Sequence, residues 1–340
     1  MKILLLAGGD SNEREVSLNS SRAIYDSLVR QGHTALVIDP ANGRSLLDRD
    51  GHFIETSSKG QGAQGDPPAV IDSLALTGAL HSQDVSDVEV VFIGLHGGAG
   101  ENGSLQNLLE LAGLKYTGSD MMSSAVAMNK AIAKRLMASE NILTPKWFLY
   151  RLMDWNDHRA MAESILSGFE LPFIVKPNDG GSTVGLTKVK EKDELFGALD
   201  RAAHESKEIL VEEFIPGREM TVSVLDKQPL PVVEIRPKNE LYDYEAKYTK
   251  GKSEYIAPAP IPDDVAKGLQ EAALVVYEVI RASGLARVDF ILTPDNQYFC
   301  LELNTLPGMT NLSLAPMAAK CIGMDFDALV RRIIDSALRK

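Results

Sequence analysis

LARVDFILTPDNQYFCLELN, residues 285–304, places two acidic side chains, Asp289 and Glu302, on what we predict to be the two strands of one hairpin. The runs RVDFIL and YFCLEL flank the segment PDNQ at 294–297, whose central Asp-Asn is typical of a two-residue turn with positive φ. This register predicts that Asp289 lies opposite Glu302 and that Arg287 lies opposite Asn304 on one face of the hairpin. The opposite face is apolar and is expected to hold Val288, Phe290, Leu301 and Leu303.

Two carboxylates that face each other across a hairpin repel, because their Cβ atoms are about 4.5 to 5.5 Å apart. A divalent cation would offset this repulsion. Ligand sets made only of oxygen atoms, such as two carboxylates and an amide carbonyl, favour Mg²⁺ or Mn²⁺ over Zn²⁺, and such sites usually receive phosphate oxygens as well. The alternative is a solvated acidic surface with Arg287 as its counter-ion, since exposed charges are the norm. The hairpin alone leaves both interpretations open.

The composition is that of a globular protein with a small-molecule partner. The chain has 340 residues, enough for two or three domains, and its net charge of -12 argues against nucleic acid or an anionic membrane as a partner. No apolar stretch approaches the roughly 20 residues that span a bilayer, and the run MKILLLAGG is too short for a signal peptide. With Cys300 and Cys321 as the two cysteines, we expect no disulfide framework and a cytoplasmic location.

Alternating strands and helices predict an N-terminal α/β domain over residues 1–118. Its buried parallel strands are expected at residues 2–7, 34–39 and 88–95, where continuous apolar runs end at glycine or polar residues. Residues 56–69, rich in Gly, Ser, Gln and Pro, are expected to form a surface loop. Ligands of such a parallel sheet bind beyond the carboxyl ends of its strands.

Two further units are predicted after the α/β domain. The smaller one, residues 119–212, begins with helical sequence and contains the strand patterns FIVKP and EILVEEF. Residues 213–340 are rich in strands at first and then carry a long helix at about 263–282, the acidic hairpin, and a terminal helix opened by Asp325.

Two glycine-rich segments are candidate ligand loops. GAGENG at 98–103 matches the G-x-G-x-x-G dinucleotide pattern, but His96 and Gly97 separate it from its strand, so we expect a substrate near its N–H groups rather than NAD or a flavin. NDGGST at 178–183 is either an ordinary hairpin turn or a loop that folds over phosphate groups, with Lys176 supplying charge. GKS at 251–253 lacks the upstream glycine of a P-loop, which excludes that motif.

Four polar residues have both a structural and a functional interpretation. Glu13 precedes a predicted helix, where an acid is stabilised by the helix dipole, but it also follows the first strand, where it could bind a substrate ammonium. His96 is either a hydrogen-bonded loop residue or a catalytic one. Lys247 and Tyr248, in the string DYEAKY, belong either to a polar surface loop or to the site.

Six segments together resemble the D-alanine:D-alanine ligases of the ATP-grasp superfamily along nearly the whole chain. The matching strings are GGDSNEREVSLNS, LHGGAGENGSLQ, VKPNDGGSTVG, LYDYEAKY, ARVDF and LELNTLPGMTNLSL. The resemblance implies an ATP-grasp fold of mixed α/β and α+β class. It has an N-terminal parallel-sheet domain, a small central domain and a C-terminal antiparallel-sheet domain, with ATP between the last two.

The resemblance also implies a role for individual residues. ATP would be bound by Lys130, Lys176, Gly181, Ser182, Glu212, Glu213, Phe214, Ile215, Glu219 and Lys247. Two Mg²⁺ (or Mn²⁺) ions would be held by Asp289, Glu302 and Asn304. The two D-alanine substrates would contact Glu13, His96, Lys247, Ser313 and Leu314. Catalysis would depend on a hydrogen-bonded triad that orients the first D-alanine and on two groups that stabilise a tetrahedral intermediate: Glu13, Ser182 and Tyr248, then Arg287 and Gly308.

The activity that the resemblance implies is ATP-dependent ligation of two D-alanines through an acyl phosphate, for peptidoglycan precursor synthesis. The alternative is a related ligase that takes D-lactate or D-serine as its second substrate. Tyr248 favours D-alanine, because relatives that use D-lactate tend to carry another residue there. The expected partners are ATP and D-alanine, with no nucleic acid and no membrane, and the resemblance implies a homodimer.

Overall fold

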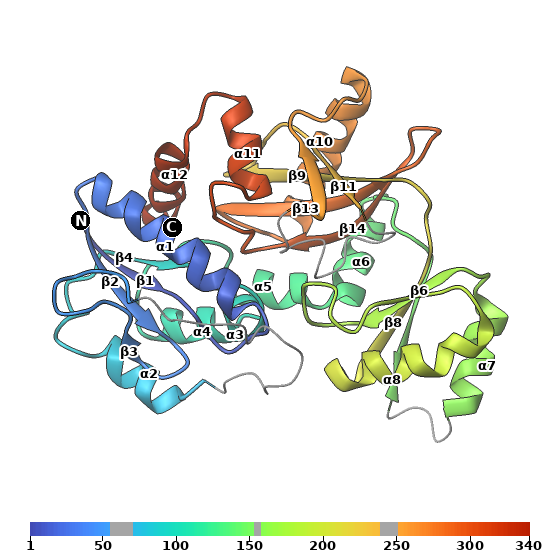
Figure 1. Cartoon of the computed structure of the whole chain (residues 1–340), viewed down its shortest axis with the longest axis horizontal. Coiled ribbons are helices and arrows are strands. Elements are labelled where there is room, and N and C mark those ends of the chain that lie inside the picture. Colours follow the sequence, from blue (N-terminus) through green and yellow to red (C-terminus); the bar gives the residue numbers. More distant parts are fainter. Residues whose placement is uncertain (55–70, 153–157, 239–250) are drawn as a thin grey trace.

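The computed structural model describes residues 1–54, 71–152, 158–238 and 251–340. The described strands form three sheets, which lie in different parts of the molecule and carry helices on their faces (Figure 1). The predicted loop at 56–69 lies outside the described residues, as do Lys247 and Tyr248. Within the described part of the chain, no helix combines the length and the apolar composition needed to cross a membrane.

The first sheet has the parallel strands predicted for the N-terminal domain. β1 (Lys2–Leu6) lies between β2 (Thr34–Asp39) and β4 (Val90–Ile93), both parallel to it, and β3 (Arg44–Ser45) adds an antiparallel edge. Ile3 and Leu5 pack on one face of the sheet and Leu4 and Leu6 on the other, because helices cover both faces. These helices include α1 (Arg14–Arg30), α2 (Ser73–Leu80) and α4 (Ser104–Leu111), and the short helix α3 (Gly98–Glu101) precedes α4.

The second sheet is the antiparallel centre of the predicted middle unit. Its strands are ordered β5 (Trp147–Arg151), β8 (Glu208–Glu213), β6 (Phe173–Pro177) and β7 (Thr187–Val189). The apolar face of this sheet packs against α7 (His158–Gly168) and α8 (Leu195–Glu205), which follows the short 3-10 turn Lys192–Glu194. FIVKP and EILVEEF are strands as predicted, and the edge strand β5 was not foreseen.

The third sheet carries the acidic hairpin. Its order is β12 (Ser253–Ile256), β11 (Val233–Pro237), β9 (Arg218–Leu225), β13 (Leu285–Leu292) and β14 (Tyr298–Asn304), and β10 (Gln228–Pro229) pairs with β9. The long helix predicted near 263–282 is α10 (Asp263–Val279), whose apolar side packs on β9 and β13. α5 (Met121–Met128) and α6 (Lys130–Ser139) pack into the same core through Ala127, Ala133 and Met137.

The last two helices join the first and third sheets. α11 (Leu314–Cys321) and α12 (Phe326–Leu338) share one apolar core with β1, α1 and β11. Asp325 begins α12 as predicted, since its carboxylate accepts a hydrogen bond of 2.8 Å from the Ala328 N–H. Figure 1 shows α12 beside α1, and Arg30 forms an ion pair of 2.7 Å with Asp327 across that contact.

The hairpin has the predicted pairing but a different turn. Asp289 is paired with Glu302 and Arg287 with Asn304, as predicted. The turn is longer than two residues, because the Thr293 N–H donates to the Gln297 carbonyl (2.8 Å) across residues 294–296. Within this turn Asn296 is the residue with a positive φ, of 64°. The extra turn residue is offset by a β-bulge between Phe290 and Asp289, which restores the register.

The bulge changes which side chain of β14 is buried. Cys300 and Leu303 are buried in the core of the third sheet. Leu301, which we expected on that face, is half-buried and lines a cavity on the other side. The prediction for Leu301 was therefore wrong, because the two-residue turn on which it rested does not form.

Candidate active site

Two adjoining cavities contain most of the predicted site residues. The first lies between the second and third sheets, and the second lies between the N-terminal domain and the third sheet. Both cavities are lined by Lys130, Gly180, Gly181, Ser182 and Glu302. A molecule in one cavity can therefore meet a molecule in the other at these residues.

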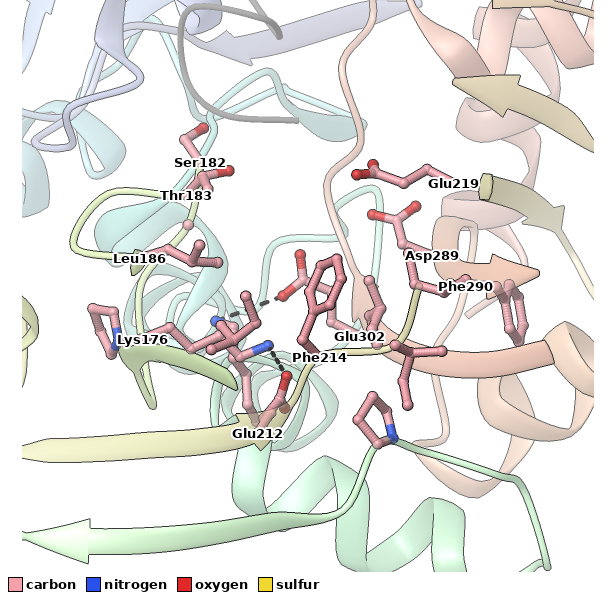
Figure 2. Close-up of a pocket in the computed structure, with 18 of the residues that line it drawn as sticks. Lys176, Ser182, Thr183, Leu186, Glu212, Phe214, Glu219, Asp289, Phe290 and Glu302 are labelled. Atoms are coloured by element: carbon pink, nitrogen blue, oxygen red, sulfur yellow. Dashed lines mark ion pairs between the residues drawn. The ribbon is translucent and has the colours of Figure 1, made fainter. Parts of the chain in front are cut away.

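Three lysines and one glutamate form the polar wall of the first cavity and the layer behind it. Glu212, at the end of β8, is paired with Lys176 from β6 (Nζ–Oε2 2.8 Å), as Figure 2 shows, and with Lys134 from α6 (Nζ–Oε1 2.9 Å). Lys130 Nζ donates to the Gly180 carbonyl (2.7 Å) and lies 3.7 Å from Glu302 Oε2. Burial lowers the pKa of Lys130 and of Lys134. The wall carries an excess of positive charge, which suits a phosphate chain.

Another part of the first cavity is an apolar slot. It is lined by Ile174, Leu186, Phe214, Met220 and Phe290, and Figure 2 shows Leu186 and Phe214 on opposite sides of it. Lys188 Nζ lies 3.4 Å from the centre of the Phe214 ring, a cation–π contact. Glu213, Phe214 and Ile215 all line this cavity, which can take a flat ring such as adenine.

The acidic hairpin faces the first cavity. Arg287 donates two hydrogen bonds of 2.8 Å each to the Asp289 carboxylate, and the Thr221 hydroxyl donates a third of 2.7 Å. Glu219, on β9, points toward the same space as Asp289 (Figure 2). Arg287 is thus the counter-ion of Asp289, as the solvated-surface interpretation predicts, but the pair is largely buried rather than exposed.

The oxygen atoms of this hairpin fit a hard divalent cation. Asp289 and Glu302 are directly opposed on adjacent strands and both line the first cavity. Asn304, two residues after Glu302 on β14, supplies its side-chain oxygen Oδ1, which accepts a hydrogen bond of 3.0 Å from the Leu306 N–H. The set contains oxygen donors alone, which suits Mg²⁺ or Mn²⁺ and not Zn²⁺. A cation on Asp289 would compete with Arg287 for the same two oxygens.

The second cavity has a carboxylate and a hydroxyl at its inner end. The Ser182 hydroxyl donates to Glu13 Oε1, joining residues 169 positions apart in the sequence. Gly97 and Gly181 leave room for the Glu13 carboxylate, since a Cβ would lie 2.7 Å from Oε2 at Gly97 and 2.9 Å from it at Gly181. The two members of the predicted triad that the structure describes, Glu13 and Ser182, are therefore in contact, and Tyr248 lies outside the described residues.

His96 lines the second cavity as a buried, neutral side chain. Its Nδ1 lies 2.9 Å from the Leu306 carbonyl and its Nε2 lies 3.0 Å from the Ser20 hydroxyl. Burial lowers the pKa of His96 more than the nearby Glu13 raises it. With both ring nitrogens engaged, His96 fastens the N-terminal domain to the loop after β14 and shapes the cavity wall.

The outer part of the second cavity lies at the start of α11. Ser313 and Leu314 line it together with Arg287 and Gly308. Ser313 Oγ accepts a hydrogen bond of 3.0 Å from the Thr310 N–H, and it precedes the first helical residue, Leu314. A helix of 8 residues that begins at the cavity directs its N–H groups and positive end toward a carboxylate there.

Glu101 is a residue of the second cavity that the sequence analysis missed. It is 7% exposed, and its Oε1 has no hydrogen-bond partner. Burial, and then the charge of Glu13, raise the pKa of Glu101 to about 8. Glu101 lies within GAGENG, and the sequence analysis considered only the glycine pattern of this segment. A carboxylate between Gly100 and Gly103, shortly after a buried strand, was the available signal.

Within GAGENG, a side chain rather than a glycine lines the second cavity. Gly98 to Glu101 form the short helix α3, and Glu101 is the residue of this segment that lines the second cavity. A Cβ at Gly98 would lie 2.6 Å from Asp10 Oδ1, so this glycine allows the loop after β1 to approach. Gly98 serves the close packing of two loops, and the side chain of Glu101 reaches the second cavity.

Lys134 was also missed, since a lysine on an amphipathic helix predicts a solvated side chain. It is 0% exposed and lies behind the first cavity, where it contacts Glu212 and the Thr144 hydroxyl. Its place on the buried side of α6, four residues after Lys130, was the only signal that the sequence offered.

Both halves of the chain match one known family. Residues 2–119 match the family described as D-ala D-ala ligase N-terminus, and residues 136–335 match D-ala D-ala ligase C-terminus. The chain is 41% identical over 341 residues to the D-alanine–D-alanine ligase of Syntrophotalea carbinolica, covering 100% of the chain and 97% of the relative. It is 40% identical to that of Gloeobacter violaceus over 339 residues, covering 99% of the chain and 100% of the relative.

Solved structures agree with these sequence matches. The D-alanine–D-alanine ligase of Bacillus anthracis complexed with ATP is similar, with a TM-score of 0.77, 27% identity, and coverage of 100% of this chain and 98% of that one. The VanG D-Ala:D-Ser ligase of Enterococcus faecalis has a TM-score of 0.78 at 30% identity, with 99% of each chain covered. The ligase of Coxiella burnetii has a TM-score of 0.80 at 26% identity, with 100% of this chain and 94% of that one covered.

Proposed function

This chain belongs to the D-alanine–D-alanine ligase family and joins two D-alanines with the use of ATP, and we propose that the two adjoining cavities are its active site. The product, D-alanyl-D-alanine, serves peptidoglycan precursor synthesis. The observation that supports this site most directly is the shared wall at Lys130, Ser182 and Glu302. A nucleotide phosphate and an amino-acid carboxylate would meet there.

In the proposed nucleotide site, Glu213, Phe214 and Ile215 contact adenine, and Glu219 binds the ribose. Lys130, Lys176 and the loop residues Gly181 and Ser182 contact the phosphates. Lys247, which is not among the residues that the structure describes, is proposed to contact them as well. The apolar slot and the lysine wall support this orientation, because the slot lies between the β8–β9 connection and β13 while the charge lies toward the second cavity.

Asp289, Glu302 and Asn304 are proposed to hold two Mg²⁺ or Mn²⁺ ions. When bound, the ions supply Lewis-acid neutralisation of the phosphate oxygens. The protein's own residues would contact the phosphate chain as well: Lys130 and Lys176 present their ammonium groups from α6 and β6.

The first step makes the carboxylate of one D-alanine a better electrophile. Glu13 is proposed to bind the ammonium of this substrate, with Ser182 and Tyr248 fixing the glutamate. A carboxylate oxygen attacks the γ-phosphorus, the bond from that phosphorus to the β–γ bridging oxygen breaks, and ADP leaves. The product is an acyl phosphate, and Lys176 offsets the negative charge that is spread over the transferred group.

The second step forms the amide bond. The amine of the second D-alanine, whose carboxylate lies at Ser313, Leu314 and Lys247, attacks the carbonyl carbon of the acyl phosphate after losing a proton. Arg287 and the Gly308 N–H stabilise the oxyanion of the tetrahedral intermediate, and inorganic phosphate then leaves. His96 keeps the two walls of this cavity together, which helps to exclude the water that would hydrolyse the acyl phosphate.

The wider organisation is proposed as follows. The three sheets support a division into an N-terminal domain at 1–118, a central ATP-grasp part at 119–212 and a C-terminal part with the metal site at 213–340. We propose that the enzyme works in the cytoplasm, where ATP is available, and that it is a homodimer. Light scattering of the purified protein would give twice the 37.0 kDa chain mass for a dimer.

One incubation tests the activity and the acceptor together. The protein is incubated with ATP, Mg²⁺ and D-alanine, and ADP and D-alanyl-D-alanine are measured by mass spectrometry. Parallel reactions contain D-alanine with an excess of D-lactate or of D-serine. Formation of the D-alanine dipeptide as the main product supports the proposal. A mixed product that predominates at equal acceptor concentration would move the assignment to a ligase of the D-lactate or D-serine type.

A further inference from the structure

The Glu212 carboxylate is shared by two lysines that differ in their access to ligand. Lys176 lines the nucleotide cavity, and its ammonium lies 2.8 Å from Glu212 Oε2. Lys134 lies 2.9 Å from Glu212 Oε1, is 0% exposed, and does not line that cavity. Among the described residues, its other polar contact is the Thr144 hydroxyl, on the chain segment that leads from α6 to β5.

The two lysines together keep Glu212 ionised. Burial by itself would raise the pKa of Glu212, but the charges of Lys134 and Lys176 outweigh burial and hold this pKa below its usual value. With both lysines protonated and Glu212 ionised, these three buried residues carry one net positive charge. Such a group is stable when every charge has a partner, and it becomes costly when one partner is removed and a buried charge is left alone.

Lys176 has two competing partners in the working enzyme. It is paired with Glu212 in the structure, and the proposed function requires it to bind a phosphate. If Glu212 had no other cation, every phosphate contact made by Lys176 would leave a buried carboxylate unpaired. Lys134 removes this conflict, because it stays beside Glu212 on the side that the nucleotide does not reach.

We propose that Lys134 is a positioning residue for ATP, which keeps the Glu212 carboxylate neutralised so that Lys176 is free to bind the nucleotide phosphates. This inference rests on the proposed phosphate-binding role of Lys176. Lys134 itself does not contact the nucleotide in this proposal. It also explains why a lysine is placed at a fully buried position of α6, where an apolar residue would otherwise be more stable.

The test compares the affinities of ATP and adenosine in the full-length protein by isothermal titration calorimetry. The dissociation constant of adenosine divided by that of ATP measures what the phosphates contribute to affinity. Changes at the adenine end affect both constants and cancel in this ratio. Lys134→Met is expected to lower this ratio about tenfold, as for a typical coupling between neighbouring sites, while adenosine affinity changes less than threefold. Lys134→Gln keeps a hydrogen-bond donor beside Glu212 and removes the charge. It is the variant of choice if Lys134→Met does not fold, with the same result expected.

A second substitution separates charge compensation from a packing role. Adding Glu212→Gln to Lys134→Met removes the carboxylate that Lys134 compensates, so the ratio is expected to return to within threefold of that of Glu212→Gln alone. A packing defect at Lys134 would persist in the double variant. Arg135→Met, at the exposed neighbouring position of α6, is the matched control and is expected to leave the ratio unchanged.

The outcomes distinguish the inference from the proposed function. If Lys176→Met leaves the ratio unchanged, Lys176 does not bind phosphate, and the proposed nucleotide orientation is wrong. If Lys176→Met lowers the ratio and both Lys134 variants leave it unchanged, the inference about Lys134 is overturned and the proposed function stands. An equal loss of ATP and adenosine affinity in the Lys134 variants would also overturn the inference, because it would show a general defect of the cavity.

Discussion

Glu101→Gln is expected to change how the stability of this protein depends on pH. Glu101 is buried beside Glu13, and its pKa rises from the ordinary 4.5 to about 8. The folded state therefore holds a proton on Glu101 between pH 4.5 and 8 that the unfolded chain has released. Because the folded state binds more protons in this window, the free energy of unfolding falls as pH rises through it.

The magnitude follows from the size of the pKa change. At about 1.4 kcal/mol per pH unit, a rise from 4.5 to about 8 costs the folded state at most about 5 kcal/mol at pH 9. Glutamine has nearly the shape of a protonated glutamate and stays neutral. The variant should therefore be about as stable as the parent protein at pH 5 and more stable at pH 9, by several kcal/mol.

Urea unfolding at five pH values between 5 and 9 measures this difference. The quantity of interest is the free energy of unfolding of the variant minus that of the parent, because other titrating groups cancel in it. Glu140→Gln, at an exposed position at the end of α6, is the control and should give a difference that is flat with pH. If the Glu101→Gln difference is also flat, the carboxyl is not held protonated, and the account of this cavity wall is wrong.

Three further predictions concern the site. Asp289→Ala should abolish D-alanine-dependent ADP release and the Mg²⁺ dependence of ATP binding, and full turnover by the purified variant would refute the metal assignment. Gly97→Ala should cost about 1 to 3 kcal/mol of stability, because Gly97 has φ 65° and ψ -172° and a Cβ would lie 2.7 Å from Glu13 Oε2. The thermal unfolding temperature should fall and the KM for D-alanine should change. A variant with unchanged stability and KM would contradict this close approach. Tyr248→Phe should raise the share of D-alanyl-D-lactate formed when D-alanine and D-lactate compete, and product ratios equal to those of the parent would count against its role.

The hairpin shows how a correct prediction can rest on an incorrect detail. The alternation of apolar and polar residues at 287–292 and 298–303 predicts two strands and the face on which Asp289 and Glu302 lie. The predicted turn is one residue too short, and the bulge restores the pairing at Asp289. Turn length and bulge depend on local hydrogen bonds that several sequences can satisfy. The facing of the two acids is fixed more strongly, because the other face of the strands must be buried.

Buried charges are where the sequence was least informative. Lys134 and Glu101 lie on segments whose patterns predict a solvated lysine and a glycine-rich loop. Their burial arises from elements distant in the chain: β8 brings Glu212 to Lys134, and the loop after β1 brings Glu13 to Glu101. A charged residue in a short window predicts exposure, and the partner that makes burial possible lies outside that window.

The sequence by itself predicted the buried parallel strands of the first sheet and the pairing of Asp289 with Glu302 on one hairpin, and the structure confirms both. These follow from periodicity, which records at each position whether a side chain is buried. The tertiary structure decided which distant residues meet: Ser182 with Glu13, and Glu212 between Lys134 and Lys176. Such contacts depend on how the sheets and helices pack against one another, and the free energy of that packing is summed over the whole chain rather than carried by any one segment.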